Sequence, residues 1–179
     1  MVLGFFRKDP RRVIIETLYQ RIAEASREAR LYQRFGVPDT VEGRFESLAL
    51  HLILVLRRLR ALPSPANEVA QDVVDAFFHY LDHSLRELAV GDLAVPKRMK
   101  KLAEAFNGRS LAYDAALQQT GDGELKQALQ RNVIGAERPG ADLAAYVRAS
   151  EAELAKLDLD ALLGQGPRFA APVAREKAP

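Results

Sequence analysis

Apolar residues recur every three to four positions along most of the chain, which is the spacing that gathers them on one face of an α-helix. No stretch shows the alternation of apolar and polar residues that is typical of a half-exposed β-strand. The first helix is predicted to begin at Asp9 and Pro10, a capping residue followed by a favoured first helical residue. Its apolar stripe comprises Ile14, Leu18, Ile22, Ala25 and Ala29, before Gly36 and Pro38 break the chain.

A second helix is predicted to start at Asp39 or Thr40, where Asp39 and Glu42 resemble a capping box. Residues 48–56 are apolar almost all round the helix, so we expect this segment to be the central, buried helix of the fold. Arginines in the last turn suit the negative end of the helix dipole, and Pro63 stops the helix.

Two further long helices follow. The third is predicted to begin at Ser64 and Pro65 and to end at Gly91. The fourth carries Pro96 in its first turn and continues across Gly108, although a glycine inside a helix costs about 1 kcal/mol relative to alanine. Their predicted core faces are Val69, Val73, Phe77, Leu81, Leu85 and Leu88 in the third helix, and Met99, Leu102, Phe106, Tyr113 and Leu117 in the fourth.

Two shorter helices are predicted in the last third of the chain. Asp122 should cap one that ends near Asn132, and the other spans about residues 141–157. Residues 164–179 hold glycine and proline without any periodicity, which is typical of a disordered tail. The sequence therefore predicts an all-α protein. It has a single compact domain of about six to seven helices at 10–163, an apolar and basic N-terminal segment at 1–9 and a disordered C-terminal tail at 164–179.

Composition narrows the possible functions. The chain has 179 residues and no cysteine, which excludes disulfides, thiol nucleophiles and iron–sulfur clusters. The formal net charge is only +2, so any binding of anions must come from a local cluster of charge. No apolar run reaches the roughly 20 residues of a spanning helix, and the N-terminal run is too short for a signal peptide. We expect a cytoplasmic protein that at most lies on the inner face of the cytoplasmic membrane.

Histidines offer the one candidate for metal chemistry. Asp75, His79 and His83 follow one another at every fourth position of the third helix, a spacing that suits a metal ligand set. The simpler interpretation is an exposed helix face with two ordinary histidines. His51 lies alone in the most apolar helix, where either a haem ligand or a buried, hydrogen-bonded histidine fits, and we favour the second. We predict no cofactor and no metal. The chain has no phosphate-binding glycine loop or nucleophile elbow, which is weak evidence against an enzyme.

A basic cluster opens the fourth helix. Lys97, Arg98, Lys100 and Lys101 fall in its first turns, where the helix dipole disfavours cations and like charges repel one another. The cluster is either a solvated face or a binding site for an acidic protein surface, anionic lipid or RNA. Nucleic acid is the weakest of these targets because no aromatic residue is interleaved for base stacking, so we expect no sequence-specific nucleic-acid binding.

The middle of the chain resembles the ubiquinol–cytochrome c chaperone family. The resemblance rests on the order and spacing of several short segments over about residues 13–150. They are Gly36-Val37-Pro38-Asp39-Thr40, Gly43-Arg44-Phe45-Glu46, His51-Leu52, Leu85-Arg86-Glu87, Val90-Gly91-Asp92-Leu93, Val95-Pro96-Lys97-Arg98-Met99-Lys100, Phe106-Asn107-Gly108-Arg109 and Tyr113.

This resemblance implies an all-helical, non-enzymatic chaperone that binds newly made cytochrome b during the assembly of ubiquinol–cytochrome c reductase, respiratory complex III. A small helper protein and the ribosome are further partners that it implies. From the family segments and the basic cluster together, we predict a polar partner-binding rim and a set of structural positions. The predicted rim consists of Arg86, Glu87, Asp92, Lys97, Lys100, Lys101 and Arg109, and the structural positions are Arg44, Glu46, Gly91, Pro96 and Gly108.

Two other functions stay open at this point. One is a generic helical adaptor at the membrane surface or the ribosome that serves a different client. The other is a metal-binding protein that uses Asp75, His79 and His83.

Overall fold

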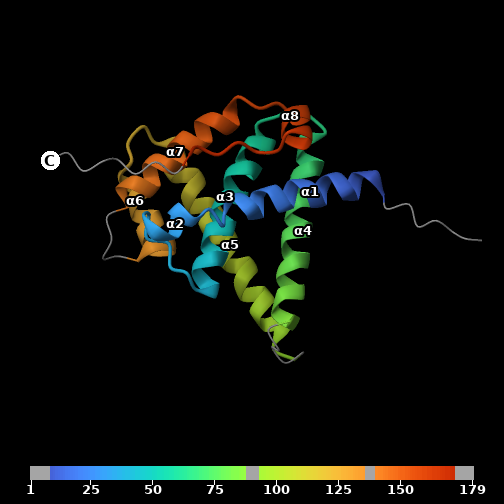
Figure 1. The fold of residues 1–179 in the computed structure, drawn as a ribbon, viewed down its shortest axis with the longest axis horizontal. Helices are drawn as coiled ribbons and strands as arrows, with labels where there is room; N and C mark the ends of the chain where they lie inside the picture. Colours follow the sequence, from blue (N-terminus) through green and yellow to red (C-terminus); the bar gives the residue numbers. More distant parts are fainter. Residues whose placement is uncertain (1–8, 88–92, 136–139, 172–179) are drawn as a thin grey trace, which may run out of the picture.

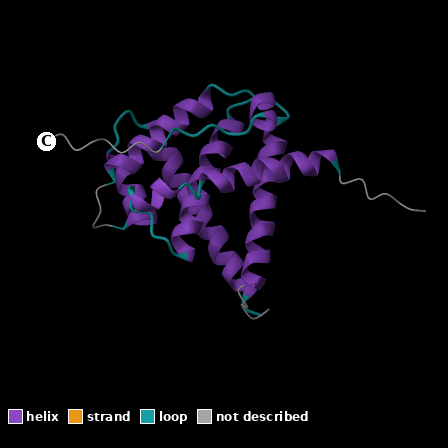
Figure 2. Cartoon of the chain, viewed as in Figure 1, coloured by secondary structure: helices purple, strands orange, loops and turns teal. Residues whose placement is uncertain are grey.

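The computed structural model describes residues 9–87, 93–135 and 140–171, and within these ranges the chain is helical with no strand (Figures 1 and 2). This confirms the all-α prediction. The elements in chain order are α1 (Pro10–Ala25), α2 (Ala29–Gln33), α3 (Val41–Arg60), α4 (Ala66–Glu87), α5 (Val95–Gln118), α6 (Gly123–Leu129), the π-helical turn η1 (Gln130–Ile134), α7 (Ala141–Ala155) and α8 (Leu159–Gly164).

Helix α3 is the centre of the fold, as its sequence predicts. Every residue of 49–56 is buried, including His51. Helices α1, α4, α5 and α7 all pack against α3, so each side of it meets a neighbour. A helix that is apolar nearly all round is suited to this central position, because none of its sides faces water.

Helix α1 begins as predicted and buries Leu18 and Ile22 of its predicted stripe, but the stripe differs at its start. The Asp9 carboxylate accepts a hydrogen bond from the Arg11 backbone amide, with Pro10 in the first turn. The predicted core residue Ile14 is 42% exposed, whereas Ile15 and Tyr19 are buried. The face turns toward α4 as well as α3, because the Tyr19 ring stacks on Tyr80 of α4 at a centroid distance of 4.7 Å.

The link from α1 to α3 corrects the predicted extent of the first helix and decides between the two predicted starts of the second. The predicted single first helix ends at Ala25, and Ala29 opens the separate helix α2. The cap of α3 is Thr40, whose hydroxyl accepts from the Gly43 amide, while Asp39 accepts from Arg44 instead. Position 43 has no room for a side chain, since a Cβ there would lie 2.0 Å from the Pro38 carbonyl oxygen. This close approach explains why the first turn of α3 carries a glycine.

Helices α4 and α5 lie against each other and extend to the lower end of the molecule in Figure 1. The rings of Phe77, Phe78 and Phe106 pack together between them. Helix α5 continues through Gly108 as one helix and has Pro96 in its first turn, as predicted. Leu88 and Gly91, predicted at the end of the third helix, lie outside the described residues.

The C-terminal helices close the other end of α3. Asp122 stands before α6 but makes no capping hydrogen bond; its carboxylate accepts from Arg148 of α7 instead. The same guanidinium also donates to the Ala116, Leu117 and Gln119 carbonyls. Arg148 therefore satisfies the open carbonyls at the end of α5, which explains why no cap residue is needed there.

The part of the chain that packs on the domain extends beyond the predicted start of the C-terminal tail. The sequence pattern places the start of the tail at residue 164, yet residues 164–171 lie on the domain. Phe169 meets His51 edge-on at a centroid distance of 4.8 Å, and the Ala170 amide donates to the Ser150 hydroxyl. A short segment without periodicity can still be ordered when one aromatic side chain anchors it in the core.

None of the helices in the described ranges combines the length and apolar character that crossing a bilayer requires.

Candidate functional site

An apolar groove of about 680 Å³ opens between α3, α4 and α5. Its walls come from the first turns of α3, the second half of α4 and the first half of α5, with Ser26 and Arg27 closing one side. This volume is within the roughly 300–1,000 Å³ range of clefts that bind ligands in proteins. The apolar lining residues are Val41, Phe45, Leu48, Leu81, Leu85, Leu102 and Ala105.

The groove exists because apolar stripes run past the point where their partner helices cover them. On α4 the stripe begins with Val73 and Phe77, which have no exposure, and continues to Leu81 and Leu85, which are only half-buried. Leu102 on the facing side of α5 is half-buried in the same way. The same periodic positions that build the core therefore build a partly open apolar surface at the lower end of the helices.

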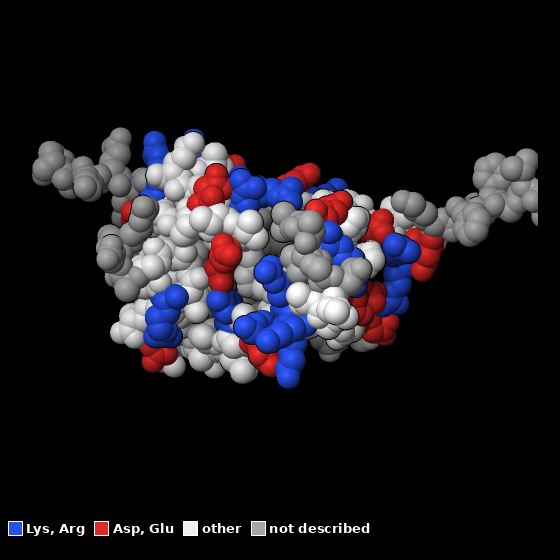
Figure 3. All heavy atoms as spheres, turned by 90° about the horizontal axis from the view of Figure 1, so that it is seen from below, with Lys and Arg blue, Asp and Glu red and all other residues white. Residues whose placement is uncertain are grey.

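Cations surround this opening. Arg27, Arg98 and Lys101 line the groove and form no ion pair among the described residues. Arg44 also lines it, and its guanidinium bonds Asp39 at 2.8 Å. Figure 3 shows that Lys and Arg side chains gather in the middle of the face at this end of the molecule. The exposed carboxylate of Glu42 also lines the groove, which thus combines an apolar lining with a mainly positive rim.

One ion pair holds two walls of the groove together. Glu46 of α3 and Arg109 of α5 face each other with side chains only 10% and 20% exposed. Arg109 also donates to the Ala105 carbonyl and lies 6.0 Å from the centroid of the Phe45 ring. Burial raises the pKa of Glu46, and its hydrogen bonds and charge attraction with Arg109 oppose that rise.

The structure divides the predicted partner-binding residues into three groups. Lys101 and Arg109 line the groove, but the guanidinium of Arg109 is already engaged by Glu46. Lys97 and Lys100 are exposed on α5 beside it. Arg86 and Glu87 are exposed on α4 and do not line the groove. Arg86 bonds Asp82 at 2.8 Å, and Glu87 lies 3.8 Å from His83. Asp92 lies outside the described residues.

The predicted structural positions also separate. Glu46 forms an ion pair with Arg109, whereas the ion pair of Arg44 among the described residues is with nearby Asp39. Pro96 occupies the first turn of α5, and Gly91 is not described. A Cβ at Gly108 would meet nothing within 4 Å, so packing does not require a glycine there.

Sequence reasoning missed the apolar lining and Arg27. Leu81, Leu85 and Leu102 of the lining continue the predicted core stripes, and the sequence contains no signal for where a neighbouring helix ends. Arg27 follows α1 in the chain and reaches the groove only through the turn between α1 and α2. Neither feature is visible without the tertiary arrangement.

His51 is a buried, hydrogen-bonded histidine, as favoured from the sequence. Its Nδ1 lies 2.7 Å from the Ser47 carbonyl oxygen, which only accepts, so Nδ1 carries the proton. Nε2 therefore accepts from the Tyr146 hydroxyl at 2.7 Å. Burial lowers the pKa of His51 to about 4, against the opposing effect of the Ser47 hydrogen bond. The ring is a neutral structural link between α3 and α7 at physiological pH.

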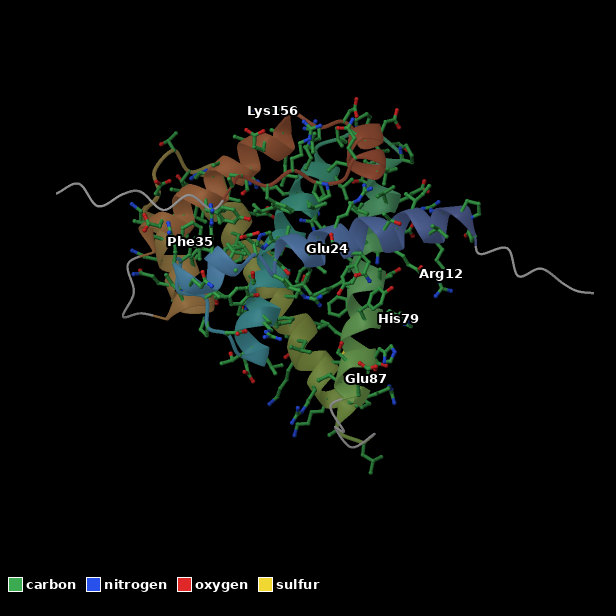
Figure 4. All side chains as sticks on the ribbon, viewed as in Figure 1. Arg12, Glu24, Phe35, His79, Glu87 and Lys156 are labelled. Carbon is green, nitrogen blue, oxygen red and sulfur yellow. The ribbon has the colours of Figure 1, made fainter. Side chains whose placement is uncertain are left out.

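The candidate metal ligands do not converge. His79 and Glu87 lie on the outer side of α4 (Figure 4), and the Asp75 carboxylate accepts from Gln71. Within the described part of the chain no three His, Asp or Glu residues gather in a geometry that would hold a metal ion. The regular spacing of Asp75, His79 and His83 places them on an exposed helix face, which by itself brings no further ligand.

The fold and the groove define a class: a helical binding protein with an apolar, positively rimmed groove. The chain belongs to the ubiquinol–cytochrome c chaperone family, whose model matches residues 33–169. The crystal structure of the Cbp3 homolog from Brucella abortus is similar, with a TM-score of 0.79 and 39% sequence identity over 96% of this chain and 98% of that chain. No curated protein matches the sequence. The matched range contains all of the groove lining except Ser26 and Arg27.

Proposed function

We propose that this protein is an assembly chaperone of ubiquinol–cytochrome c reductase, and that the apolar groove binds a hydrophobic helix of newly made cytochrome b. The observation that carries the proposal is the groove itself, which lies almost entirely within the part of the chain that matches the chaperone family. A chaperone of a membrane protein has to cover apolar helix surface before that surface finds its final neighbours.

The size of the groove suits one face of a helix. A groove of about 680 Å³ takes a few large side chains, and a helix presents such side chains at positions i, i+3, i+4 and i+7. Half-buried Leu81, Leu85 and Leu102 would become covered when the helix docks. Because these residues already have part of their surface buried, the gain from apolar contact is moderate and the client can leave again.

The charged groups around the groove have two different roles in this proposal. The Glu46–Arg109 pair fixes the distance between α3 and α5 and so keeps the groove open to a constant width. Arg27, Arg98 and Lys101, which form no ion pair in the described chain, are free to meet polar or acidic groups that flank the apolar helix. The apolar lining and the positively charged rim together orient the bound segment, because its apolar face and its polar flanks have to meet different parts of the groove.

Site-specific photo-crosslinking in the native host tests the proposal. A photoreactive benzophenone residue replaces Leu85 in the groove or, as a matched control, Leu111, which is 72% exposed on α5 and does not line the groove. We expect cytochrome b to be the product from position 85 and to be absent from position 111. Equal yields at both positions, or a different protein at position 85, would contradict the assignment.

The groove variant Leu85→Asp supplies a functional readout. It places a charge on the apolar lining without removing a fully buried core residue, so we expect the fold to survive and the level of assembled complex III to fall. Normal complex III in the Leu85→Asp strain would contradict a role for the groove.

We further propose that a small helper protein and the ribosome contact other surfaces, and crosslinks from the Leu111 position would report one of them.

A further inference from the structure

One apolar side chain projects fully into solvent at the lower end of the molecule. Leu93, in the link that leads into α5, is 99% exposed, and the next most exposed large apolar side chain of the described residues is Leu111 at 72%. A leucine held entirely in water contributes nothing to the core. Single exposed leucines are ordinary, so the surroundings of Leu93 decide whether this one has a role.

The chain that follows Leu93 is strongly positive. Residues 93–102 include Lys97, Arg98, Lys100 and Lys101 and no acidic residue, whereas Asp92, outside the described residues, directly precedes Leu93 in the sequence. Lys97, Arg98 and Lys101 form no ion pair with any described residue, and Lys100 reaches only Glu104, at 3.9 Å. Cations at the start of a helix oppose its dipole, so folding alone does not favour this arrangement.

We propose that this end of the molecule binds the surface of an anionic phospholipid bilayer. The binding surface, which we name the basic tip, consists of Leu93, Lys97, Arg98, Lys100 and Lys101. Peripheral binding strengthens with the apolar area that enters the headgroup region and with the attraction of cations to anionic lipids, and the tip offers both. The inference does not rest on the proposed client, since it follows from exposure and charge at the tip.

The position of the basic tip gives it a consequence for the groove. Arg98 and Lys101 belong to both the tip and the groove lining, so the groove opens beside the surface that would lie on the bilayer. The hydrophobic helices of a membrane protein are present at that location. RNA fits the same cations less well, because residues 93–102 contain no aromatic side chain for base stacking.

Tryptophan fluorescence tests insertion directly, because the chain has no tryptophan of its own. The variant Leu93→Trp carries the reporter at the tip. The variant Leu111→Trp carries it at an exposed position roughly 24 Å further along α5, from the helical rise per residue. With vesicles of phosphatidylglycerol and phosphatidylcholine, we expect a blue shift for Leu93→Trp only. With vesicles of pure phosphatidylcholine, we expect none. An unshifted Leu93→Trp spectrum, or equal shifts in both variants, would overturn the proposal.

Charge reversal tests the electrostatic part without touching the groove, because Lys97 and Lys100 do not line it. The Lys97→Glu/Lys100→Glu variant should sediment with anionic vesicles at least about 25-fold more weakly, at about fivefold per lost cation. The control Arg34→Glu/Arg131→Glu, with the same number of reversals at other exposed positions, should bind within about twofold of the parent. Circular dichroism establishes that each variant is folded.

Three outcomes decide this inference, and the first two separate it from the proposed function. Loss of vesicle binding in Lys97→Glu/Lys100→Glu with an intact crosslink from position 85 supports the basic tip whatever the client is. Unchanged vesicle binding in that variant overturns the tip, even if cytochrome b is crosslinked. Binding to ribosomes that depends on the same lysines, with no binding to anionic vesicles, assigns the cations to RNA and also overturns it.

Discussion

The carboxylate of Glu46 accepts two hydrogen bonds from the guanidinium of Arg109, one from Nε and one from Nη2, each 2.5 Å long. The two residues are 63 positions apart in the sequence and belong to α3 and α5, the helices on opposite sides of the apolar groove. A bidentate pair of this kind fixes both distance and orientation. The groove therefore has a rigid link at one end and an open, positively charged rim at the other.

Breaking this pair should destabilise the fold. We expect Glu46→Gln or Arg109→Met to lower the free energy of unfolding by about 2–3 kcal/mol, somewhat below the cost for a fully buried pair because Arg109 keeps part of its exposure. Each single variant leaves the charged group of the remaining partner largely buried and without its counter-charge. Urea denaturation followed by circular dichroism measures the change.

The double variant Glu46→Gln/Arg109→Met, which combines the two single changes, provides the control for that prediction. If the two groups interact as a pair, the double variant loses less stability than the sum of the two single variants. Arg44→Met is the matched exposed control, because the Arg44–Asp39 pair is about two-thirds exposed on both sides and should matter little. Additive single effects would show that the pair is not the source of the stability.

The buried His51 should make the fold sensitive to acid. Its pKa falls from 6.5 to about 4 on folding, so between these values the unfolded chain binds a proton that the folded chain does not. Stability therefore rises as pH increases through this window and is lost as pH falls through it. Between pH 7 and pH 5 the loss from this group should be about 2 kcal/mol.

Urea denaturation of the parent and of His51→Gln at both pH values isolates this contribution. The glutamine retains a group that can accept from Tyr146 but has no proton to gain. We expect His51→Gln to be less stable than the parent at pH 7 and to lack the 2 kcal/mol part of the pH dependence. The same pH dependence in both proteins would assign acid sensitivity to other groups.

Much of the helical architecture follows from the hydrophobic pattern alone. Residues 48–56 are apolar all round, and α3 is the buried centre; Asp9 and Pro10 begin α1, and α5 crosses Gly108 without a break. The pattern fails where a neighbouring element decides which residues are covered. Ile14 fits an ideal helical stripe, but α1 packs on α4 as well as α3, Tyr19 stacks on Tyr80, and Ile15 is buried in place of Ile14.

The site was less accessible to sequence reasoning than the fold. The basic cluster was found because four cations at a helix start conflict with the helix dipole, a conflict that is visible in the sequence. The groove was not found, because Leu81 and Leu85 have the same spacing as the buried Val73 and Phe77 and differ only in what covers them. Arg109 is predicted for the rim; it lines the groove, and its guanidinium bonds Glu46, a contact that the sequence does not reveal.

Gly43 and Gly108 should respond in opposite ways to alanine. At Gly43 the new methyl group would overlap the backbone oxygen of Pro38, so Gly43→Ala should cost about 2–3 kcal/mol as the first turn of α3 shifts. At Gly108 it would meet nothing, so Gly108→Ala should stabilise α5 by about 0.5–1 kcal/mol. Thermal denaturation of the two variants provides the comparison. A stabilised Gly43→Ala would mean that the turn before α3 adapts at no cost, and a destabilised Gly108→Ala would point to a backbone requirement within α5.

Phe169 should anchor the C-terminal segment to the domain. Its ring covers His51 from outside the helical core, and the Ala170 amide bonds Ser150 of α7 next to it. Because Phe169 is half-buried, Phe169→Ala should lower stability by about 1–3 kcal/mol, less than a fully buried phenylalanine. It should also admit water to His51, which brings the folded-state pKa of His51 back toward its ordinary value and weakens the acid sensitivity described above. Arg168→Ala, at the exposed neighbouring position, is the control and should change neither property. Urea denaturation at pH 7 and pH 5 reads out both effects, and a Phe169→Ala protein with the parent's stability at both pH values would show that residues 164–171 do not contribute to the core.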